Sequence, residues 1–146
     1  MKRHASLIPL SHEHHEALIL ARLLQKTTPP YKGLPNEPAE KAQYALNFFQ
    51  DKLLTHFIQE ESLIPIVKGI SPELDILMEE MVSEHVEIRN LFEQLAHETN
   101  FLESNDHLGK TLETHIRKEE RQIFPLIQES CNDGVLDKIR VLLSQH

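Results

Sequence analysis

The 146-residue sequence contains a single cysteine, Cys131. One cysteine cannot form an internal disulfide, which is typical of proteins in the reducing cytoplasm. The chain also lacks any stretch approaching the roughly 20 apolar residues that a membrane-spanning helix requires. Its first fifteen residues, MKRHASLIPLSHEHH, are basic but lack the apolar run of a secretory signal. We therefore expect a soluble, cytoplasmic protein.

Positive charge is scarce as well. The chain has 15 lysines and arginines against 23 aspartates and glutamates, which gives a formal net charge of −8. Nucleic acids and anionic membranes are bound by basic surfaces, so neither is expected as a partner. The chain is long enough to bury a core alone, and we expect one domain over residues 1–146. Histidine, in contrast, is abundant, with ten residues.

Two segments of the chain place a histidine four residues before a pair of glutamates. THFIQEESLIPIV has His56 before Glu60, and THIRKEERQIFPLI has His115 before Glu119. Residues i and i+4 lie on the same face of an α-helix, so each segment directs an imidazole and a carboxylate at one point. Each segment is therefore predicted to supply two ligands to a metal ion.

The chain also repeats its own organisation. SEHVEIRNLFEQL aligns with HEHHEALILARLL at an offset of 71, which places His85 opposite His14. An offset of 59 places His115 opposite His56. The repeated unit is a helix with Glu-His followed by a helix with the His–Glu pair, which favours His14 and His85 as further ligands. His15 is an alternative to His14, because two adjacent histidines leave the register open.

Apolar residues recur at helical spacing almost throughout, and no strand pattern occurs. Helices are expected over residues 11–26, 39–67, 72–99, 105–129 and 135–145. Ser11 and Ser71 are the expected N-caps of the first and third helices. The proline-rich segment 27–38 is expected to be a crossing loop. These elements predict an all-α fold, an antiparallel up-down-up-down four-helix bundle with a short C-terminal fifth helix.

Glu60 and Glu119 lie within the apolar stripes of their helices. An unpaired buried carboxylate is strongly unfavourable, so a cation is expected between them. Imidazole and carboxylate ligands suit divalent iron, manganese or zinc. Six donors suit two ions about 3.5–4 Å apart better than one ion. Such ions would keep open positions, where a solvent oxygen or a small diatomic molecule binds.

These features together resemble the hemerythrin-like (HHE cation-binding) family, over essentially the whole sequence. The resemblance implies two iron ions in a non-haem di-iron centre bridged by two carboxylates. The implied terminal ligands are His14, His56, His85 and His115. The implied bridges are Glu60 and Glu119. Glu61 and Glu120 point about 100° away from the bridges, so we interpret them as solvated or as hydrogen-bonded to ligand histidines.

The chain differs from the oxygen-carrying hemerythrins at two places. They have a second histidine four residues after the third-helix histidine, where this chain has Arg89. They have an aspartate five residues after the fourth-helix histidine, whereas Glu119 follows His115 by four. The resemblance therefore implies binding or sensing of dioxygen, iron or nitric oxide rather than bulk oxygen transport.

Two alternative functions remain. One is a di-iron oxidoreductase acting on peroxide or nitric oxide, and the other is an interaction module with a vestigial metal site. The sequence shows no catalytic acid or base outside the metal ligands, which favours the binding function. Ferritin-like di-iron bundles are excluded, since they require a glutamate three residues before each ligand histidine. Those positions hold Ser11, Leu53, Val82 and Leu112. The histidines outside the apolar stripes are expected at the surface: His4, His12, His97, His107 and His146.

Overall fold

The computed structural model describes residues 2–145, and every regular element among them is helical. The α-helices are α1 (Ile8–Leu23), α2 (Pro38–Phe48), α3 (Leu54–Glu61), α4 (Ile64–Val67), α5 (Pro72–Leu95), α6 (Phe101–Lys118), α7 (Phe124–Ser130) and α8 (Asp133–Ser144). A 3-10 turn, η1 (Ala5–Leu7), precedes α1, and two π-helical turns, η2 (Phe49–Leu53) and η3 (Glu119–Ile123), join α2 to α3 and α6 to α7. The all-helical class predicted from the sequence is confirmed.

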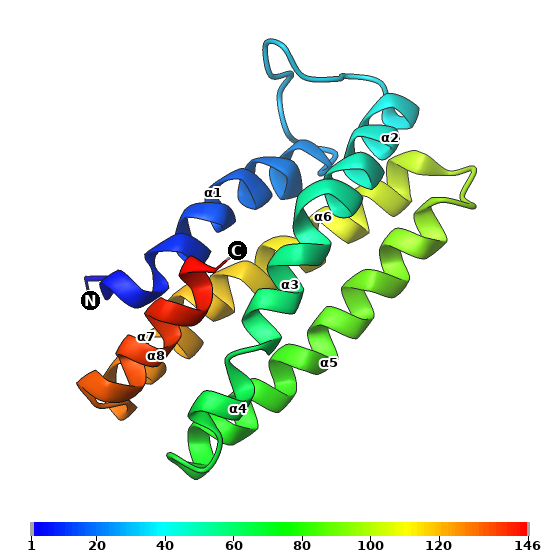
Figure 1. Ribbon diagram of the computed structural model, residues 1–146. Helices are drawn as coiled ribbons and strands as arrows, with labels where there is room; N and C mark the ends of the chain where they lie inside the picture. The colour runs from blue at the N-terminus through cyan, green and yellow to red at the C-terminus, as the bar shows by residue number, and fades with distance from the viewer. Residues whose placement is uncertain (1, 146) are drawn as a thin grey trace.

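The long helices lie lengthwise against one another (Figure 1). Helix α6 packs against α1, α2 and α5, and α3 contacts α1. The extended segment between α1 and α2 crosses one end of the molecule, where the proline-rich loop was predicted, and α8 packs against η1 and α4 at the other end. Among residues 2–145, no helix combines the length and apolar character that crossing a membrane needs.

The helix starts differ from the prediction at one of the two expected caps. Ser71 caps α5 as predicted, since its hydroxyl accepts a hydrogen bond of 3.1 Å from the Leu74 N–H. The prediction for Ser11 is wrong, because α1 begins at Ile8 and continues the 3-10 turn before it. The Ser11 hydroxyl instead donates to Glu120 at 2.7 Å. Ser11 therefore supports a carboxylate on another helix.

The π-helical turn η3 has a cause in the sequence. Five residues lie between Glu119 and Pro125, whereas four lie between Glu60 and Pro65 in the first half of the chain. A π-helical turn holds one residue more than an α-helical turn and is often found at functional sites. The wider turn accommodates the additional residue, so Glu119 stays in register with its counterpart Glu60.

The buried apolar side chains form two clusters with a polar layer between them. On α1, Leu10 belongs to one cluster, Ala17 belongs to the other, and His14 lies between them. Helix α8 covers the first cluster with Leu136 and Ile139. The apolar clusters therefore shield the polar layer from solvent at both of its ends.

One close approach between helices depends on a glycine. A β-carbon added at Gly109 on α6 would collide with the backbone carbonyl of Ala21 on α1. We expect Gly109→Ala to destabilise the protein by about 1–3 kcal/mol, because α1 and α6 must move apart. Denaturant unfolding measures the change. Gly134→Ala is the control, since a β-carbon at Gly134 meets no atom closer than 3.4 Å, and the expected stability is equal or slightly higher. Equal stability of both variants would contradict the proposed clash.

Candidate metal centre

Six ionisable side chains come together in the polar layer between the two apolar clusters. They are His14 from α1, His56 and Glu60 from α3, His85 from α5, His115 from α6 and Glu119 from η3. All six are buried, and none is more than 4% exposed. The structure thus brings together every residue that the sequence proposed as a metal ligand.

These six residues divide into two groups of four potential donors, and Glu60 and Glu119 belong to both groups. The first group adds His14 and His56, and the second adds His85 and His115. The ligand atoms within each group lie within 4.8 Å of one another. Two carboxylates shared between two pairs of histidines give two neighbouring groups of residues that could each hold a metal ion.

The Nε2 atoms of the histidines face the two carboxylates. His14 Nε2 and His56 Nε2 lie 3.2 and 3.1 Å from Glu60 Oε2, whereas His85 Nε2 lies 3.1 Å from Glu60 Oε1. The two oxygens of Glu60 therefore face different histidine pairs. Glu119 Oε1 lies 3.0 Å from His14 Nε2 and 3.3 Å from His115 Nε2. Each carboxylate therefore contacts histidines of both pairs.

Several polar atoms in the layer lie close to an oppositely charged group but form no hydrogen bond of acceptable geometry among the described residues. They are His56 Nε2, His115 Nε2 and both carboxylate oxygens of Glu119. A buried polar atom without a partner costs roughly 1–3 kcal/mol, and more if it is charged. Divalent cations would satisfy all four atoms at once, and imidazole and carboxylate are the ligand types that divalent iron, manganese and zinc accept. The residues present therefore fit a metal pair.

The other ring nitrogen of each histidine meets a second carboxylate. These Nδ1 contacts are His14–Glu120 at 2.7 Å, His56–Glu13 at 3.0 Å, His85–Glu61 at 2.7 Å and His115–Glu84 at 2.7 Å. A carboxylate that accepts a hydrogen bond from Nδ1–H fixes the ring orientation and leaves the Nε2 lone pair free for a metal. We call Glu13, Glu61, Glu84 and Glu120 the outer carboxylates.

Sequence reasoning identified two of the outer carboxylates and missed the other two. The interpretation of Glu61 and Glu120 as hydrogen-bonded to ligand histidines is confirmed. Glu13 and Glu84 were missed, although the internal repeat aligns them at the same offset as His14 and His85. Each lies next to one histidine in sequence but binds a histidine on another helix. These contacts follow the internal repeat, because Glu13 on α1 contacts His56 on α3 in the same way that Glu84 on α5 contacts His115 on α6.

Cations hold three of the outer carboxylates. Lys118 lies 2.7 Å from Glu84, Arg3 lies 3.2 Å from Glu120, and Arg89 lies 3.4 Å from Glu61. Arg89 follows His85 by four residues, and its side chain turns toward the Glu61 carboxylate. Its guanidinium also lies over the Phe57 ring, 5.8 Å from the centroid.

The carboxylates raise the pKa of all four histidines when no metal ion is bound. Burial by itself would lower these values. Close contacts with the carboxylates of Glu119, Glu120 and Glu60 hold the pKa of His14 well above its usual range. Attraction to the carboxylates likewise outweighs burial and raises the pKa of His56 and His85 to about 9 and that of His115 to about 10.

The buried carboxylates respond in the opposite direction. Burial and the charge of Glu60 would raise the pKa of Glu119, but His115 and His14 outweigh them and lower it to about 2. The pKa of Glu60 is also well below its ordinary value, because His56, His14 and His85 outweigh its burial. Protons on the histidines thus balance the two carboxylates, and a metal ion must displace them to bind.

The remaining histidines and the cysteine lie outside the centre. His15 is exposed whereas His14 is buried, so His14 is the member of the adjacent pair that faces the other ligands. The described histidines that were expected at the surface are all exposed: His4, His12, His97 and His107. His146 lies outside the described residues. Cys131 is buried, and its burial raises the pKa of its thiol.

Comparison with known proteins agrees with this geometry. The family model described as the hemerythrin HHE cation binding domain matches residues 7–127, a range that contains all six residues of the polar layer and all four outer carboxylates. No curated protein and no solved structure matches the chain. Because the family model covers well over half of the sequence, the chain belongs to the hemerythrin HHE cation-binding domain family.

Proposed function

We propose that this protein is a non-haem di-iron protein that binds or senses dioxygen, iron or nitric oxide. In this proposal His14, His56, His85 and His115 are the terminal ligands. Glu60 and Glu119 are the bridges. The observation that carries the proposal is the sharing of two buried carboxylates between two pairs of buried histidines. The proposal includes a single domain over residues 1–146 and an antiparallel up-down-up-down arrangement of four long helical segments, with α8 as the fifth helix.

The protein's own residues prepare the centre for a small molecule. When bound, two iron ions would supply Lewis acidity, redox chemistry and open positions for a diatomic ligand. The outer carboxylates fix the four imidazole rings, and aromatic rings restrain two of them further. Phe57 stacks on His85 with centroids 4.0 Å apart, and Phe124 stacks on His14 with centroids 5.4 Å apart. These rings and the apolar clusters restrict the space around the centre, which favours small ligands.

Metal analysis of the purified protein tests the proposal directly. We expect about two iron ions per chain, with optical spectra that differ between the reduced and the air-exposed protein. Manganese or zinc at the same stoichiometry would support the ligand set but not the choice of metal. Turnover of peroxide or nitric oxide would favour the oxidoreductase alternative. A protein that purifies without metal and takes none up would favour an interaction module with a vestigial site.

Reversible oxygen carriage is not expected from this chain. A guanidinium has no lone pair for a metal, and Arg89 pairs with Glu61, so the third-helix side lacks the additional histidine of the oxygen carriers. We expect the reduced, iron-loaded protein to oxidise in air and to stay oxidised when dioxygen is removed, as followed by its optical spectrum. Arg89→His should recover more of the reduced spectrum, whereas Arg89→Gln should behave as wild type. Repeated reversible cycles of the wild type would contradict this expectation.

A further inference from the structure

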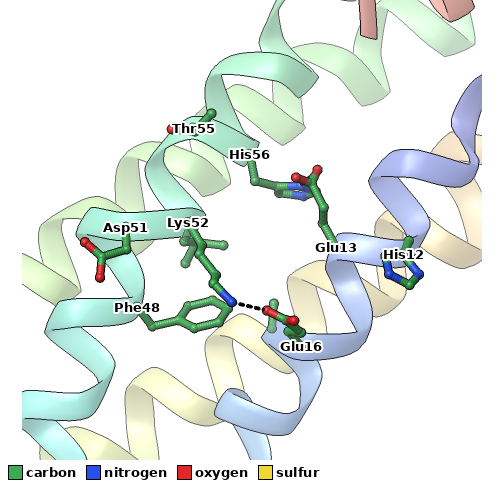
Figure 2. A pocket seen from close by; sticks show the side chains of 10 residues that line it. His12, Glu13, Glu16, Phe48, Asp51, Lys52, Thr55 and His56 are labelled. Atoms are coloured by element: carbon green, nitrogen blue, oxygen red, sulfur yellow. Dashed lines mark hydrogen bonds and ion pairs between the residues drawn. The ribbon is translucent and has the colours of Figure 1, made fainter. Parts of the chain in front are cut away.

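A groove with a volume of about 350 Å³ runs between α1 and the η2–α3 segment and ends at the Glu13–His56 pair (Figure 2). Glu13 reaches from α1 toward the His56 ring, and Lys52 bonds across the groove to Glu16 at 2.7 Å. His56 lines the groove, where Glu13 contacts its Nδ1 at 3.0 Å, and its Nε2 faces Glu60 in the polar layer at 3.1 Å. We call this cavity the Glu13 groove. It connects solvent with one ligand of the metal centre.

The internal repeat supplies a second groove for comparison. This Glu84 groove, also of about 350 Å³, ends at the Glu84–His115 pair. The Glu13 groove is lined by three carboxylates and one ammonium: Glu13, Glu16, Asp51 and Lys52. The Glu84 groove is lined by two carboxylates and two ammonium groups: Glu84, Glu87, Lys110 and Lys118. The carboxylates and ammonium groups therefore leave the first groove more negative than the second by two charges, and each groove contains one buried ligand histidine, His56 or His115.

The outer carboxylates at the ends of the two grooves also differ. The Glu84 side chain is 27% exposed, and Lys118 neutralises it at 2.7 Å. The Glu13 side chain is 43% exposed, and the ammonium that lines its groove, Lys52, is paired with Glu16 instead. Glu13 thus keeps its charge available to an approaching cation while it touches His56. The Glu84 carboxylate is less available to an approaching cation, because Lys118 already neutralises it.

We propose that divalent cations reach the metal centre through the Glu13 groove and not through the Glu84 groove. The proposal rests on the metal centre of the proposed function and adds the route by which that centre is filled. A negative, partly enclosed groove raises the local concentration of cations and speeds their capture. The rim residues Glu16, Asp51 and Lys52 set this charge without touching the six proposed ligands. Their substitution is therefore expected to change the rate of metal uptake and not the final metal content.

Stopped-flow uptake of Co²⁺ by the metal-depleted full-length protein tests the route, because bound cobalt absorbs in the visible range. At low ionic strength, Glu16→Gln and Asp51→Asn should each slow uptake by roughly two- to fivefold, and Lys52→Gln should speed it by a similar factor. Salt should reduce these differences. Glu87→Gln and Lys110→Gln are the matched controls in the Glu84 groove, and Glu87 is the counterpart of Glu16 in the repeat. Both controls should load at the wild-type rate.

The outcomes separate the route from the centre itself. All five variants should bind about two Co²⁺ ions per chain at equilibrium. If the wild type and all five variants bind two Co²⁺ ions at the same rate, the proposed route is wrong and the proposed metal centre still stands. Equal slowing by Glu16→Gln and Glu87→Gln would indicate an effect of net charge alone and would also overturn it. Failure of the wild type to bind Co²⁺ would overturn both the centre and the route.

Discussion

Replacing either proposed bridge, as Glu60→Ala or Glu119→Ala, is expected to remove metal from both positions of the centre. Each carboxylate belongs to both groups of four donors, so its loss leaves each position with three of those donors. Each position also loses the negative charge that offsets its cation. We expect metal content, measured by elemental analysis after dialysis, to fall from about two ions per chain to well below one.

The outer carboxylates provide the matched controls, because Glu61 and Glu120 follow the bridges directly in sequence. They touch Nδ1 of His85 and of His14, on the far side of each ring from the centre. Glu61→Ala and Glu120→Ala should weaken metal binding by roughly 10- to 100-fold and still reach about two ions per chain when metal is in excess. An equal loss of metal in all four alanine variants would contradict the ligand assignment. Glu60→Gln keeps the side-chain volume and serves as a second test if the alanine variant does not fold.

The sequence was sufficient for those parts of the centre that lie on one helix. His56 with Glu60 and His115 with Glu119 follow from the helical repeat alone, since i and i+4 share a face. The choice between His14 and His15 needed the packed structure, in which His14 is buried and His15 is exposed. A stripe of apolar residues locates a helix face only to within about one residue in each turn.

Contacts between helices were harder to predict than contacts within one helix. The pairing of Glu13 with His56 depends on the rotation and spacing of α1 and α3, which no periodicity within a single helix specifies. The same limit explains Ser11, whose hydroxyl was assigned to a helix cap and instead binds Glu120. The π-helical turn at η3 was missed as well, although the extra residue before Pro125 is visible once the two halves are aligned.

Removal of the metal is expected to lower the melting temperature, and the loss should grow as the pH rises from 6.5 to 10. Ligands that bind the folded state stabilise it by about 2.7 kcal/mol when their free concentration is 100 times the dissociation constant. For a chain of this length, that corresponds to roughly 10 °C. Thermal unfolding followed by circular dichroism, with and without a chelator, measures the difference at each pH.

The pH dependence follows from the ionisation of the metal-free core. The pKa of His56 and His85 is raised to about 9 and that of His115 to about 10, above the value of about 6.5 expected in the unfolded chain. A raised pKa contributes stability that is fully present below about pH 6.5 and is lost as the pH rises through 9 to 10. The pKa of Glu119 is lowered to about 2, so its contribution is present above about pH 4.5 and is lost in acid. The metal-free protein should therefore be most stable between about pH 4.5 and 6.5.

The metal-loaded protein should follow a different curve, because bound cations replace the protons that balance Glu60 and Glu119. Its stability should persist above pH 6.5, because metal binding has to displace fewer histidine protons as the pH rises toward 9 to 10, and should fall in acid as protons displace the metal. Glu119→Gln is the control, since the pKa of His115 is raised mainly by attraction to Glu119. In the metal-free state this variant should lose less stability between pH 6.5 and 10 than the wild type. A metal-free wild type that melts at a constant temperature across this range would show that the histidines do not hold the protons, and some other cation must then balance the two buried carboxylates.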